Sequence, residues 1–314
     1  MQHWIKAKIL VGVSGGPDSV ALSRVIHAAK VQSGQSVDDL HVVHVNHQTR
    51  PSSDADERFV AELADELGVG LHIVRRDTTT AENESASEEC LRDFRYAAML
   101  DTAKRLGIRF LATGHTADDQ IETLLFRLAR GTGLYGLTGI PFVRVQDSVS
   151  IVRPLLQFRK RELLQVLSEL NQTYCRDESN EESDYTRNFL RNEIVPALSD
   201  KFGGQFDQSL QRIASQAAQH IELLDELADP LIRKQDGSFE VEQLAAAHPV
   251  VAIHALRKIW RGAGFDEGAM TAEKWKHFYL FIAERSASHI QLPGNVTAKL
   301  DDSGLKFETT ASKR

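Results

Sequence analysis

The stretch Ile9-Leu-Val-Gly-Val-Ser-Gly-Gly-Pro-Asp-Ser19 is an apolar run that breaks into a short turn carrying two glycines, a carboxylate and two hydroxyls. Gly15 and Gly16 leave the backbone free to take positive φ and to direct successive N–H groups into one concavity. A helix expected from Pro17 onward would present its positive dipole end to an anion there. The stretch predicts a strand, a phosphate-binding loop and a helix, with a nucleotide as ligand. The alternative is a glycine-rich turn that binds nothing.

The loop is not of the Walker type, because GxxxxGK[ST] is absent and no Gly-Lys pair occurs in the chain. Ser14–Ser19 instead resembles the SGGxDS loop of the N-type ATP pyrophosphatases. This resemblance implies that ATP is bound and that the bond at its α-phosphate is broken. The ATP-binding residues that it implies are Ser14, Gly15, Gly16, Pro17, Asp18 and Ser19.

The composition is that of an ordinary soluble protein: 314 residues, 42% hydrophobic and 26% charged, enough for about two domains. A net charge of −7 argues against a protein that coats nucleic acid, but it leaves room for a local basic patch. The two cysteines, Cys90 and Cys175, form no CxxC pair, which suits a reducing compartment. No segment resembles a signal peptide or a membrane span, so we expect a cytoplasmic protein with no membrane partner.

Strand-like and helix-like segments alternate through the first half of the chain. The expected strands lie near 7–13, 40–46, 70–75 and 108–113, and the expected helices near 17–31, 53–67, 85–106 and 116–130. This alternation predicts an α/β fold with a doubly wound, mainly parallel sheet. The loops Ser14–Ser19, Asn46–Arg50 and Gly114–Asp119 then converge at the carboxyl ends of the strands, where such sheets bind ligands.

The pattern changes from about Phe206, with amphipathic stretches near 206–234, 239–263 and 271–285 and short strands across 290–307. We expect a smaller, mostly helical C-terminal domain that ends in a short β segment. Pro196 and the Gly203-Gly204 pair interrupt the pattern, so the domains are placed at 1–203 and 204–314.

Acids gather in the segment Gly114–Thr123, which follows a buried strand and opens a helix. Thr116 or Asp118 would cap that helix, and acids are favoured in a first turn, so a purely structural interpretation is available. Next to a phosphate loop, however, unpaired acids would repel ATP unless a cation lay between. Asp18 and Asp119 are therefore candidate Mg²⁺ ligands, and His115 a residue that contacts phosphate or moves a proton.

Two other patterns lead to weaker predictions. Alternation along a strand places His44 on the face opposite His41 and His47, which argues against a zinc site there. Gly131–Gly136 matches GxGxxG, but it follows a helix and has no βαβ unit around it, so a dinucleotide site is rejected. Its glycines favour a flexible loop that approaches or closes over a ligand.

Cationic side chains are concentrated between residues 121 and 161. They are Arg127, Arg130, Arg144, Arg153, Arg159, Lys160 and Arg161, opposed by Glu122 and Asp147. In a protein of net negative charge, such a cluster beside a nucleotide site suggests a polyanionic second substrate, although a solvated surface is the alternative. Further on, an acidic loop from Arg176 runs into a helix on which Arg187 and Arg191 are one turn apart and are expected to share a face.

Short motifs occur along the first two hundred residues in the order seen in the tRNA(Ile)-lysidine synthases. They are Ser14–Ser19, His44-Val45-Asn46-His47 with Arg50, Arg92-Asp93-Phe94-Arg95-Tyr96, Gly114–Thr123, Arg127–Gly133, Arg153–Leu156 with Arg159, and Asp177–Asn180 with Arg187, Asn188 and Arg191. Each single motif is shared with other ATP pyrophosphatases, whereas the ordered set resembles this family specifically. The C-terminal region resembles the family in type and size more than in motif.

The resemblance implies a two-step reaction at the wobble cytidine of an isoleucine tRNA with the anticodon CAU. The C2 carbonyl oxygen of the cytidine attacks the α-phosphate of ATP and releases pyrophosphate. The ε-amine of free lysine then attacks the adenylated C2 and releases AMP. The modified tRNA reads AUA in place of AUG and has isoleucine rather than methionine identity.

The resemblance also implies residue roles. The catalytic residues are Asp18, His115, Asp119, Arg92 and Arg95, with Asp18 and Asp119 as Mg²⁺ ligands. Arg92, Arg95 and His115 offset negative charge or orient the reacting groups. The tRNA-binding residues are Arg127, Arg130, Arg153, Arg187, Asn188 and Arg191, and the Gly131–Gly136 loop closes over the flipped-out base. The lysine-binding residues and the oligomeric state stay open, a homodimer being one alternative.

Two departures from the family stand out. Gln48-Thr49 occupies the place of a frequent Gly-Leu pair, which leaves the role of that loop open. Longer members carry an extra C-terminal domain that contacts tRNA, whereas this chain ends after a short β segment. We therefore expect its tRNA contacts to come from the catalytic domain and the single helical domain.

Two other functions fit parts of the sequence. A PP-loop tRNA thiolase would also adenylate a base, but it needs cysteines to deliver sulfur, and Cys90 and Cys175 are not paired for that. A nucleotide-sensing protein that keeps the fold without catalysis would have lost a residue such as Asp18 or His115, and both are present.

Overall fold

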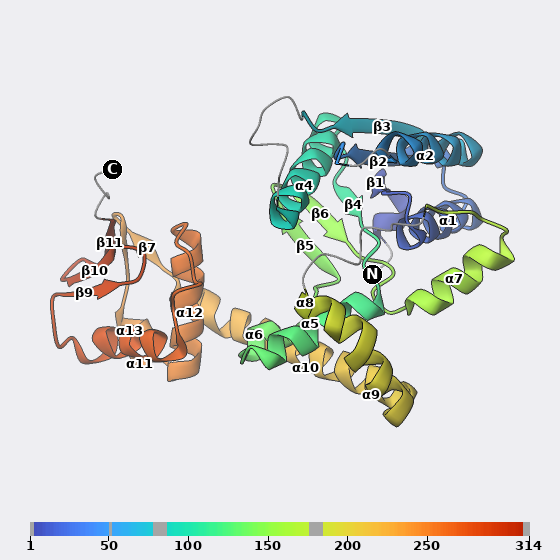
Figure 1. Cartoon of the computed structure of the whole chain (residues 1–314). Coiled ribbons are helices and arrows are strands. Elements are labelled where there is room, and N and C mark those ends of the chain that lie inside the picture. The colour runs from blue at the N-terminus through green and yellow to red at the C-terminus, as the bar shows by residue number, and fades with distance from the viewer. Residues whose placement is uncertain (1–2, 50–51, 78–86, 176–184, 310–314) are drawn as a thin grey trace. The chain divides into compact units, whose positions relative to one another are not determined.

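The apolar run Ile9–Gly12 forms strand β1, which lies inside a six-stranded sheet with the order β3-β2-β1-β4-β6-β5 (Figure 1). The other strands are β2 (Leu40–Asn46), β3 (Gly70–Arg75), β4 (Phe110–Ala112), β5 (Val143–Gln146) and β6 (Val149–Val152). Neighbouring strands are parallel except β5 and β6, which form an antiparallel hairpin at one edge. The predicted mainly parallel sheet is confirmed.

The computed structural model describes residues 3–49, 52–77, 87–175 and 185–309. The helices up to residue 228 are η1 (His3–Lys6), α1 (Pro17–Gln32), η2 (Val37–Asp39), α2 (Ser53–Leu67), α4 (Glu88–Arg105), α5 (Ala117–Ala129), α6 (Leu134–Leu137), α7 (Lys160–Glu169), α8 (Tyr185–Phe189), the π-helical turn η4 (Leu190–Ile194), α9 (Val195–Phe202) and α10 (Gly204–Ala228). None of the helices in these described ranges is both long enough and apolar enough to span a membrane.

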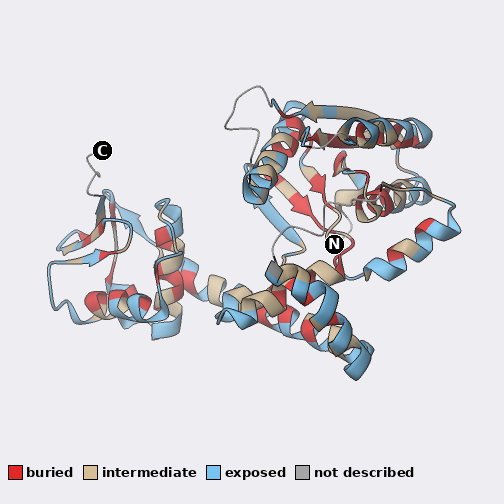
Figure 2. Ribbon diagram, in the orientation of Figure 1, coloured by how far each residue is buried: buried red, intermediate tan, exposed pale blue. Residues whose placement is uncertain are grey.

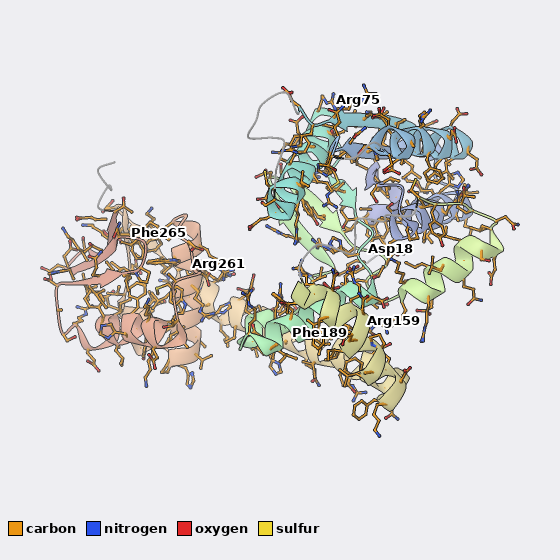
Figure 3. All side chains as sticks on the ribbon, viewed as in Figure 1. Asp18, Arg75, Arg159, Phe189, Arg261 and Phe265 are labelled. Atoms are coloured by element: carbon orange, nitrogen blue, oxygen red, sulfur yellow. The ribbon has the colours of Figure 1, made fainter. Side chains whose placement is uncertain are left out.

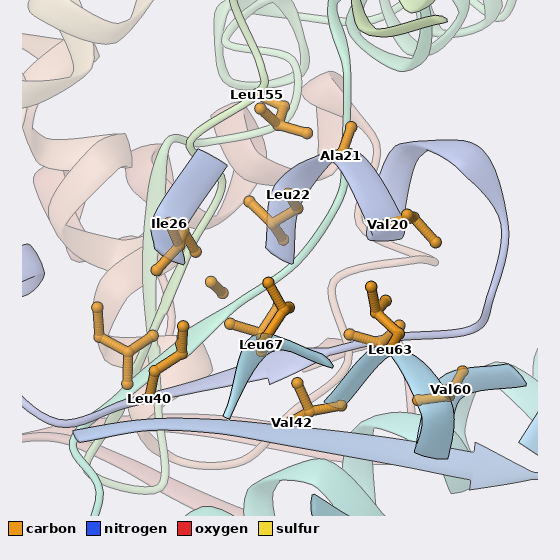
Figure 4. Close-up of a cluster of buried hydrophobic side chains, with 14 of the residues drawn as sticks. Val20, Ala21, Leu22, Ile26, Leu40, Val42, Val60, Leu63, Leu67 and Leu155 are labelled. Atoms are coloured by element: carbon orange, nitrogen blue, oxygen red, sulfur yellow. The ribbon is translucent and has the colours of Figure 1, made fainter. Parts of the chain in front are cut away.

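Three apolar clusters hold these elements together. Helices α1, α2 and α7 pack on one face of the sheet through residues such as Leu22, Leu63 and Leu163. Figure 4 shows Leu22 and Leu63 in this cluster. Helix α4 packs on the other face through Met99 and Leu100. A third cluster joins α5 to α9 and α10, as Figure 2 shows by the red, buried stripes on these helices.

The placement of α1 and α2 on one face and α4 on the other makes the sheet doubly wound. The chain therefore changes winding direction between β1 and β4, and ligands of such sheets bind at this point, outside the carboxyl ends of the strands. The loops after these two strands are in close contact: a Cβ on Gly114 would lie only 3.1 Å from the carbonyl carbon of Asp18.

The chain divides into two compact units, Met1–Ser215 and Gln216–Arg314, with the boundary inside α10. The functional domain boundary after residue 203 stays a prediction. The remaining elements are η5 (Asp229–Leu231), β7 (Lys234–Gln235), β8 (Ser238–Phe239), α11 (Glu242–Ala246), α12 (Pro249–Gly262), α13 (Ala272–Glu284), β9 (His289–Leu292), β10 (Val296–Asp301) and β11 (Gly304–Thr309). A sheet with the order β7-β8-β11-β10-β9 packs against α12 and α13 through Trp260, Trp275 and Phe278.

Two hairpins were not predicted, β5–β6 and β7–β8, and the second lies where the expected helices 206–234 and 239–263 meet. The helical residues there are 204–228, 242–246 and 249–262, so the predicted helix ends were wrong. Both hairpins have two-residue turns with positive φ, Asp147-Ser148 and Asp236-Gly237. The strands that they join have four residues each in β5–β6 and two each in β7–β8, too few for a clear alternating pattern.

Candidate active site

The phosphate loop (Ser14–Ser19) is held by its own hydroxyls. Ser19 Oγ accepts a hydrogen bond from the Ser14 N–H (3.2 Å) and donates one to the Gly16 carbonyl (2.9 Å). Gly15 uses its conformational freedom and has a φ of +94°, whereas Gly16 has a φ of −69°. Gly16 is the N-cap of α1, a position that requires extended backbone. In the described chain no side chain caps α1, so its first N–H groups are available to bind an anion.

Helix α5 carries two acids, Asp118 and Asp119, in its first turn, which follows the carboxyl end of β4. Thr116, rather than Asp118, is its N-cap: Asp119 Oδ2 accepts hydrogen bonds from the Thr116 N–H (2.8 Å) and hydroxyl (2.9 Å). Asp118 is bound by the start of α7, through Arg159 Nη1 at 3.0 Å and the Lys160 N–H at 2.6 Å. The structural interpretation of these acids is therefore correct for Asp118 and for one oxygen of Asp119.

Asp18 differs from both. Figure 3 labels its position in the fold. Its Oδ2 lies 3.8 Å from Lys160 Nζ, whereas Oδ1 is buried with no hydrogen-bond partner among the described residues. Burial raises the pKa of Asp18 to about 6, Lys160 opposes the rise, and the charges of Asp119 and Asp118 add to it. A buried, unpartnered carboxylate oxygen beside like charges has the chemistry of a ligand for a hard divalent cation.

His115 is the imidazole of the site. Its Nδ1 lies 3.0 Å from the Thr113 hydroxyl. Burial lowers the pKa of His115 to about 4; Asp119 opposes the change, and Arg153, Arg92 and Arg95 reinforce it. The ring is therefore neutral at pH 7. Of the two predicted roles, this favours orienting the reacting groups over offsetting their charge.

A cavity of about 970 Å³ lies between α4, α5 and β5 and is called the α4–β5 cavity below. Its cationic lining is Arg92, Arg95, Lys104, Arg130, Arg144 and Arg187, and its acidic lining is Glu89, Asp93, Asp101 and Asp147. The structure thus brings together four predicted site residues from distant parts of the chain. The guanidinium groups of Arg130 and Arg187 also lie over the ring of Phe126, 4.8 and 5.5 Å from its centroid.

Glu122 joins this cavity to the acids. Arg191, in the π-helical turn, donates to Glu122 Oε2 through Nη2 (2.7 Å) and Nε (3.0 Å) and lies 3.7 Å from Asp119 Oδ1. Arg187 Nε lies 3.8 Å from Glu122 Oε1, so the expectation that Arg187 and Arg191 share a face is confirmed. Burial raises the pKa of Glu122, and Arg191 opposes the rise. Glu122 was quoted in a motif but not predicted as a site residue; its i, i+4 spacing from Asp118 was the available signal.

Arg127 and Arg153 do not line the α4–β5 cavity, although Arg153 is hydrogen-bonded to Tyr96, which does. Arg127 Nη1 donates to the carbonyls of Gly136 and Gly139, and Arg153, which is only 4% exposed, donates to the Pro141 carbonyl. Asn188 is half-buried on α8. The predicted tRNA contacts of these three residues stay predictions.

The remaining motif residues serve in other ways or are not described. His44 donates to the Val13 carbonyl at 2.8 Å, His41 contacts His72, and the His47 ring lies beside Phe94, so the predicted alternation is confirmed. Arg50, Arg176 and Asp177–Asn180 lie outside the described residues.

Cys175 was considered only as an unpaired cysteine, yet it supports the phosphate loop. Its N–H donates to the Gly15 carbonyl at 2.9 Å, and its sulfur lies 3.1 Å from where a Cβ of Gly15 would be. Nothing in the sequence near Cys175 indicates this contact, which depends on how the segment after α7 folds back.

Comparison with known proteins agrees with this geometry. Residues 2–198 match the model of the PP-loop domain, which implies the use of ATP. A tRNA(Ile)-lysidine synthase of Chlorobaculum tepidum is 37% identical over 244 residues, which cover 77% of this chain and 68% of that protein. A tRNA(Ile)-lysidine synthase of Rhodopirellula baltica is 30% identical over 321 residues, which cover 89% of this chain and 80% of that protein. A third, from Symbiobacterium thermophilum, is 39% identical, but the match covers only 45% of its length.

Among solved structures, the U34-tRNA thiolase NcsA from Methanococcus maripaludis has a TM-score of 0.58 over 68% of this chain and 72% of its own. At 18% identity this likeness concerns the fold alone. The sequence relatives are the stronger evidence for the family, because the Chlorobaculum tepidum protein is 37% identical over most of both chains. The chain belongs to the PP-loop family and, within it, to the tRNA(Ile)-lysidine synthases.

Proposed function

We propose that the protein ligates free lysine to C2 of the wobble cytidine in the CAU anticodon of an isoleucine tRNA, at the expense of ATP, which is split into AMP and pyrophosphate. The observation that carries this proposal lies within the phosphate loop: Asp18 Oδ1 is a buried carboxylate oxygen with no partner in the described chain. Family membership supports this choice of substrates.

The first step requires ATP to be held with its α-phosphate exposed to the cytidine. In the proposal Ser14, Gly15, Gly16, Pro17 and Ser19 bind the phosphates through the loop and the start of α1. Mg²⁺, held by Asp18 and by Asp119 Oδ1, the oxygen that Thr116 does not bind, would supply positive charge against the phosphates. Lys160 lies near Asp18 and adds a second positive charge at this edge.

The chemistry then proceeds by two displacements. The C2 oxygen of cytidine forms a bond to the α-phosphate while the bond to pyrophosphate breaks. The lysine ε-amine next forms a bond to C2, and the C2–O bond breaks, so that AMP leaves with the oxygen. In this proposal Arg92 and Arg95 offset the charge that develops on the phosphate, and the neutral His115 orients the reacting groups.

The polyanionic substrate is proposed to bind along the α4–β5 cavity through Arg130 and Arg187, with Arg127, Arg153, Asn188 and Arg191 as further candidates. Residues 204–314 are proposed as a second tRNA-contacting domain beside the catalytic residues 1–203. The cytoplasm, where ATP, tRNA and free lysine occur together, is the proposed location.

A direct assay tests this function. Purified protein is incubated with ATP, Mg²⁺, radiolabelled lysine and an unmodified isoleucine tRNA transcript with a CAU anticodon. We expect label in the tRNA. Without lysine, pyrophosphate and an adenylated tRNA should form, whereas ATP and lysine without tRNA should yield no lysyl-adenylate.

The same assay decides between this function and its rivals. Formation of lysyl-adenylate would instead indicate an amino-acid-activating enzyme. Sulfur incorporation from a persulfide donor, with no lysine incorporation, would indicate a thiolase. Binding of ATP with no turnover of any tRNA would indicate a nucleotide-sensing protein.

A further inference from the structure

The chain between α5 and β5 begins with the glycine-rich sequence Gly131–Gly136. Residues 134–141, which overlap its end, are called the 134–141 segment. A loop that closes over a ligand would be expected to make few contacts with the rest of the protein. The second half of this segment instead makes several. Three side chains bind its backbone: Gln120 and Arg127 from α5, and Arg153 from the end of β6.

These contacts are specific in position. Gln120, which is 7% exposed, accepts a hydrogen bond from the Ile140 N–H (2.6 Å) and donates one to the Ile140 carbonyl (3.3 Å). Arg127 donates to the carbonyls of Gly136 (3.0 Å) and Gly139 (2.9 Å), and Arg153 to that of Pro141 (2.7 Å). Gly139 has a φ of +64°, and a Cβ there would lie 2.4 Å from Gln120 Oε1. The backbone of residues 136–141 is therefore fixed in one position.

Exposed apolar side chains lie directly before this bound backbone and on the adjoining helix α5. On the short helix α6, Tyr135 is 53% exposed and Leu134 is 40% exposed, and Leu128 on the adjoining α5 is 45% exposed. Arg130, exposed at the end of α5, lies over the Phe126 ring and lines the α4–β5 cavity. An exposed aromatic ring beside cationic side chains is the arrangement by which proteins bind single-stranded RNA, through stacking on bases and attraction of phosphates.

The segment also lies at a suitable distance from the reacting groups. Gln120 directly follows Asp119 on α5 and binds Ile140, so the end of the segment at Ile140 is close to the proposed Mg²⁺ ligand Asp119. Arg127 is seven residues further along α5, roughly 10 Å at 1.5 Å per residue. Tyr135, beside the Gly136 carbonyl that Arg127 binds, is therefore about two helical turns from the acids. This separation suits a nucleotide near the reacting cytidine rather than the cytidine itself.

We propose that Gln120, Arg127 and Arg153 are positioning residues that hold the 134–141 segment in place, and that Tyr135 on this segment stacks on an unpaired base of the anticodon loop. This inference rests on the proposed function for the identity of the RNA. It changes the role of Arg127 and Arg153, which act through backbone carbonyls and not by contact with phosphate.

Binding of the unmodified tRNA transcript to the full-length protein tests the stacking. Tyr135→Ala should weaken binding roughly tenfold, the effect of losing one stacked base. Tyr135→Phe should bind like the parent, because the ring is kept. The slope of log affinity against log salt should not change in either variant, since no phosphate contact is lost. Unchanged affinity in Tyr135→Ala would overturn the proposal.

A double-mutant cycle tests the positioning role. Arg127→Met should weaken tRNA binding without changing the salt slope, whereas its matched control Arg130→Met should flatten the slope by about one unit. Added to Tyr135→Ala, Arg127→Met should cost little more, because both changes remove the same contact. Fully additive effects, or a flattened slope in Arg127→Met, would contradict the positioning role.

Two further measurements separate this inference from other failures. Equilibrium binding of ATP should be unchanged in Tyr135→Ala, which shows that the variant is folded. A parent protein that binds the transcript in a Tyr135-dependent way but never ligates lysine would overturn the proposed function and support the stacking surface. If the parent ligates lysine and the Tyr135→Ala variant binds the transcript as tightly as the parent, the proposed function is supported and the stacking surface is overturned.

Discussion

Asp18 combines a buried carboxylate oxygen without a partner in the described chain with a pKa raised to about 6. We predict that Asp18→Asn abolishes lysine ligation and also stabilises the fold, because a carboxylate that is costly to bury is replaced by a neutral amide. The shift from 3.8 to about 6 corresponds to a gain of up to about 3 kcal/mol at neutral pH. Thermal unfolding and the ligation assay together measure both effects.

The sign of this effect can be checked with pH. The pKa of Asp18 in the folded protein lies above its unfolded value of 3.8, so ionisation costs stability in full above about pH 6 and not at all below about pH 3.8. The difference in Tm between Asp18→Asn and the parent should therefore be largest above pH 6 and should shrink towards pH 4. A variant that melts below the parent at pH 7 would show that Asp18 has a structural partner.

The two titrating side chains of the site make a separate kinetic prediction. We expect kcat/KM for ATP to fall below about pH 6 as Asp18 is protonated, because the ionised carboxylate is the form proposed to bind the cation. His115, with a pKa of about 4, should not titrate between pH 5 and 8. His115→Asn should thus lower activity and keep the same acidic limb, and loss of that limb would assign it to His115.

The sequence locates the turn Ser14–Ser19 before α1 and the acidic start of α5, because each is defined by residues within one turn of chain. The roles proposed for these residues stay predictions. The sequence does not separate Arg127 and Arg153 from Arg130 and Arg187. All four are arginines near one another in motif order, but the first two donate to carbonyls of a segment whose path is set by tertiary packing. An arginine's burial depends on partners that local sequence does not reveal.

At the scale of elements, Arg159 connects three helices. It precedes α7, lies 3.0 Å from Asp118 on α5 and lies 3.1 Å from Asp207 on α10, and its own side chain is 13% exposed. Removing one partner of a buried ion pair leaves the other charge uncompensated. We predict that Arg159→Met lowers the free energy of unfolding by about 3 kcal/mol. Denaturant unfolding measures this.

The neighbouring arginine provides the control for that prediction. Arg161 lies two residues further along α7 and is exposed. Its substitution by Met should change stability by less than about 0.5 kcal/mol. Equal effects at the two positions would mean that the ion pairs of Arg159 contribute nothing beyond helix propensity. Asp207→Asn should recover part of the loss in the Arg159→Met background, because it removes the charge left unpaired.

The elements also show where sequence patterns succeed. Strands β2 and β3 and helix α2 have the predicted bounds, 40–46, 70–75 and 53–67. The strands are short runs rich in apolar residues, and the helix has a serine at its start and a glycine at its end. The strands of β7–β8 have two residues each, so no periodicity can develop. Their Asp-Gly turn is the one local sign of a hairpin, and the helical patterns on both sides of it led to the prediction of helices instead.

For the molecule as a whole, the net charge of −7 would repel RNA unless the cations are concentrated where RNA binds. Arg130 and Arg144 line the α4–β5 cavity and are both exposed. Arg58 is an exposed arginine on α2, which packs on the opposite face of the sheet from α4. Replacement of any one of these by Ala changes the net charge equally, so the three variants separate local contact from overall charge.

We predict that tRNA affinity falls steeply with salt, and that Arg130→Ala and Arg144→Ala each flatten the slope of log affinity against log salt by about one unit, since each lost phosphate contact releases one counterion fewer. Arg58→Ala should leave the slope unchanged. Filter binding between low and physiological salt measures all three. If Arg58→Ala flattened the slope as much as Arg130→Ala, the RNA would be responding to the net charge of the protein, and the α4–β5 cavity would not be its binding surface.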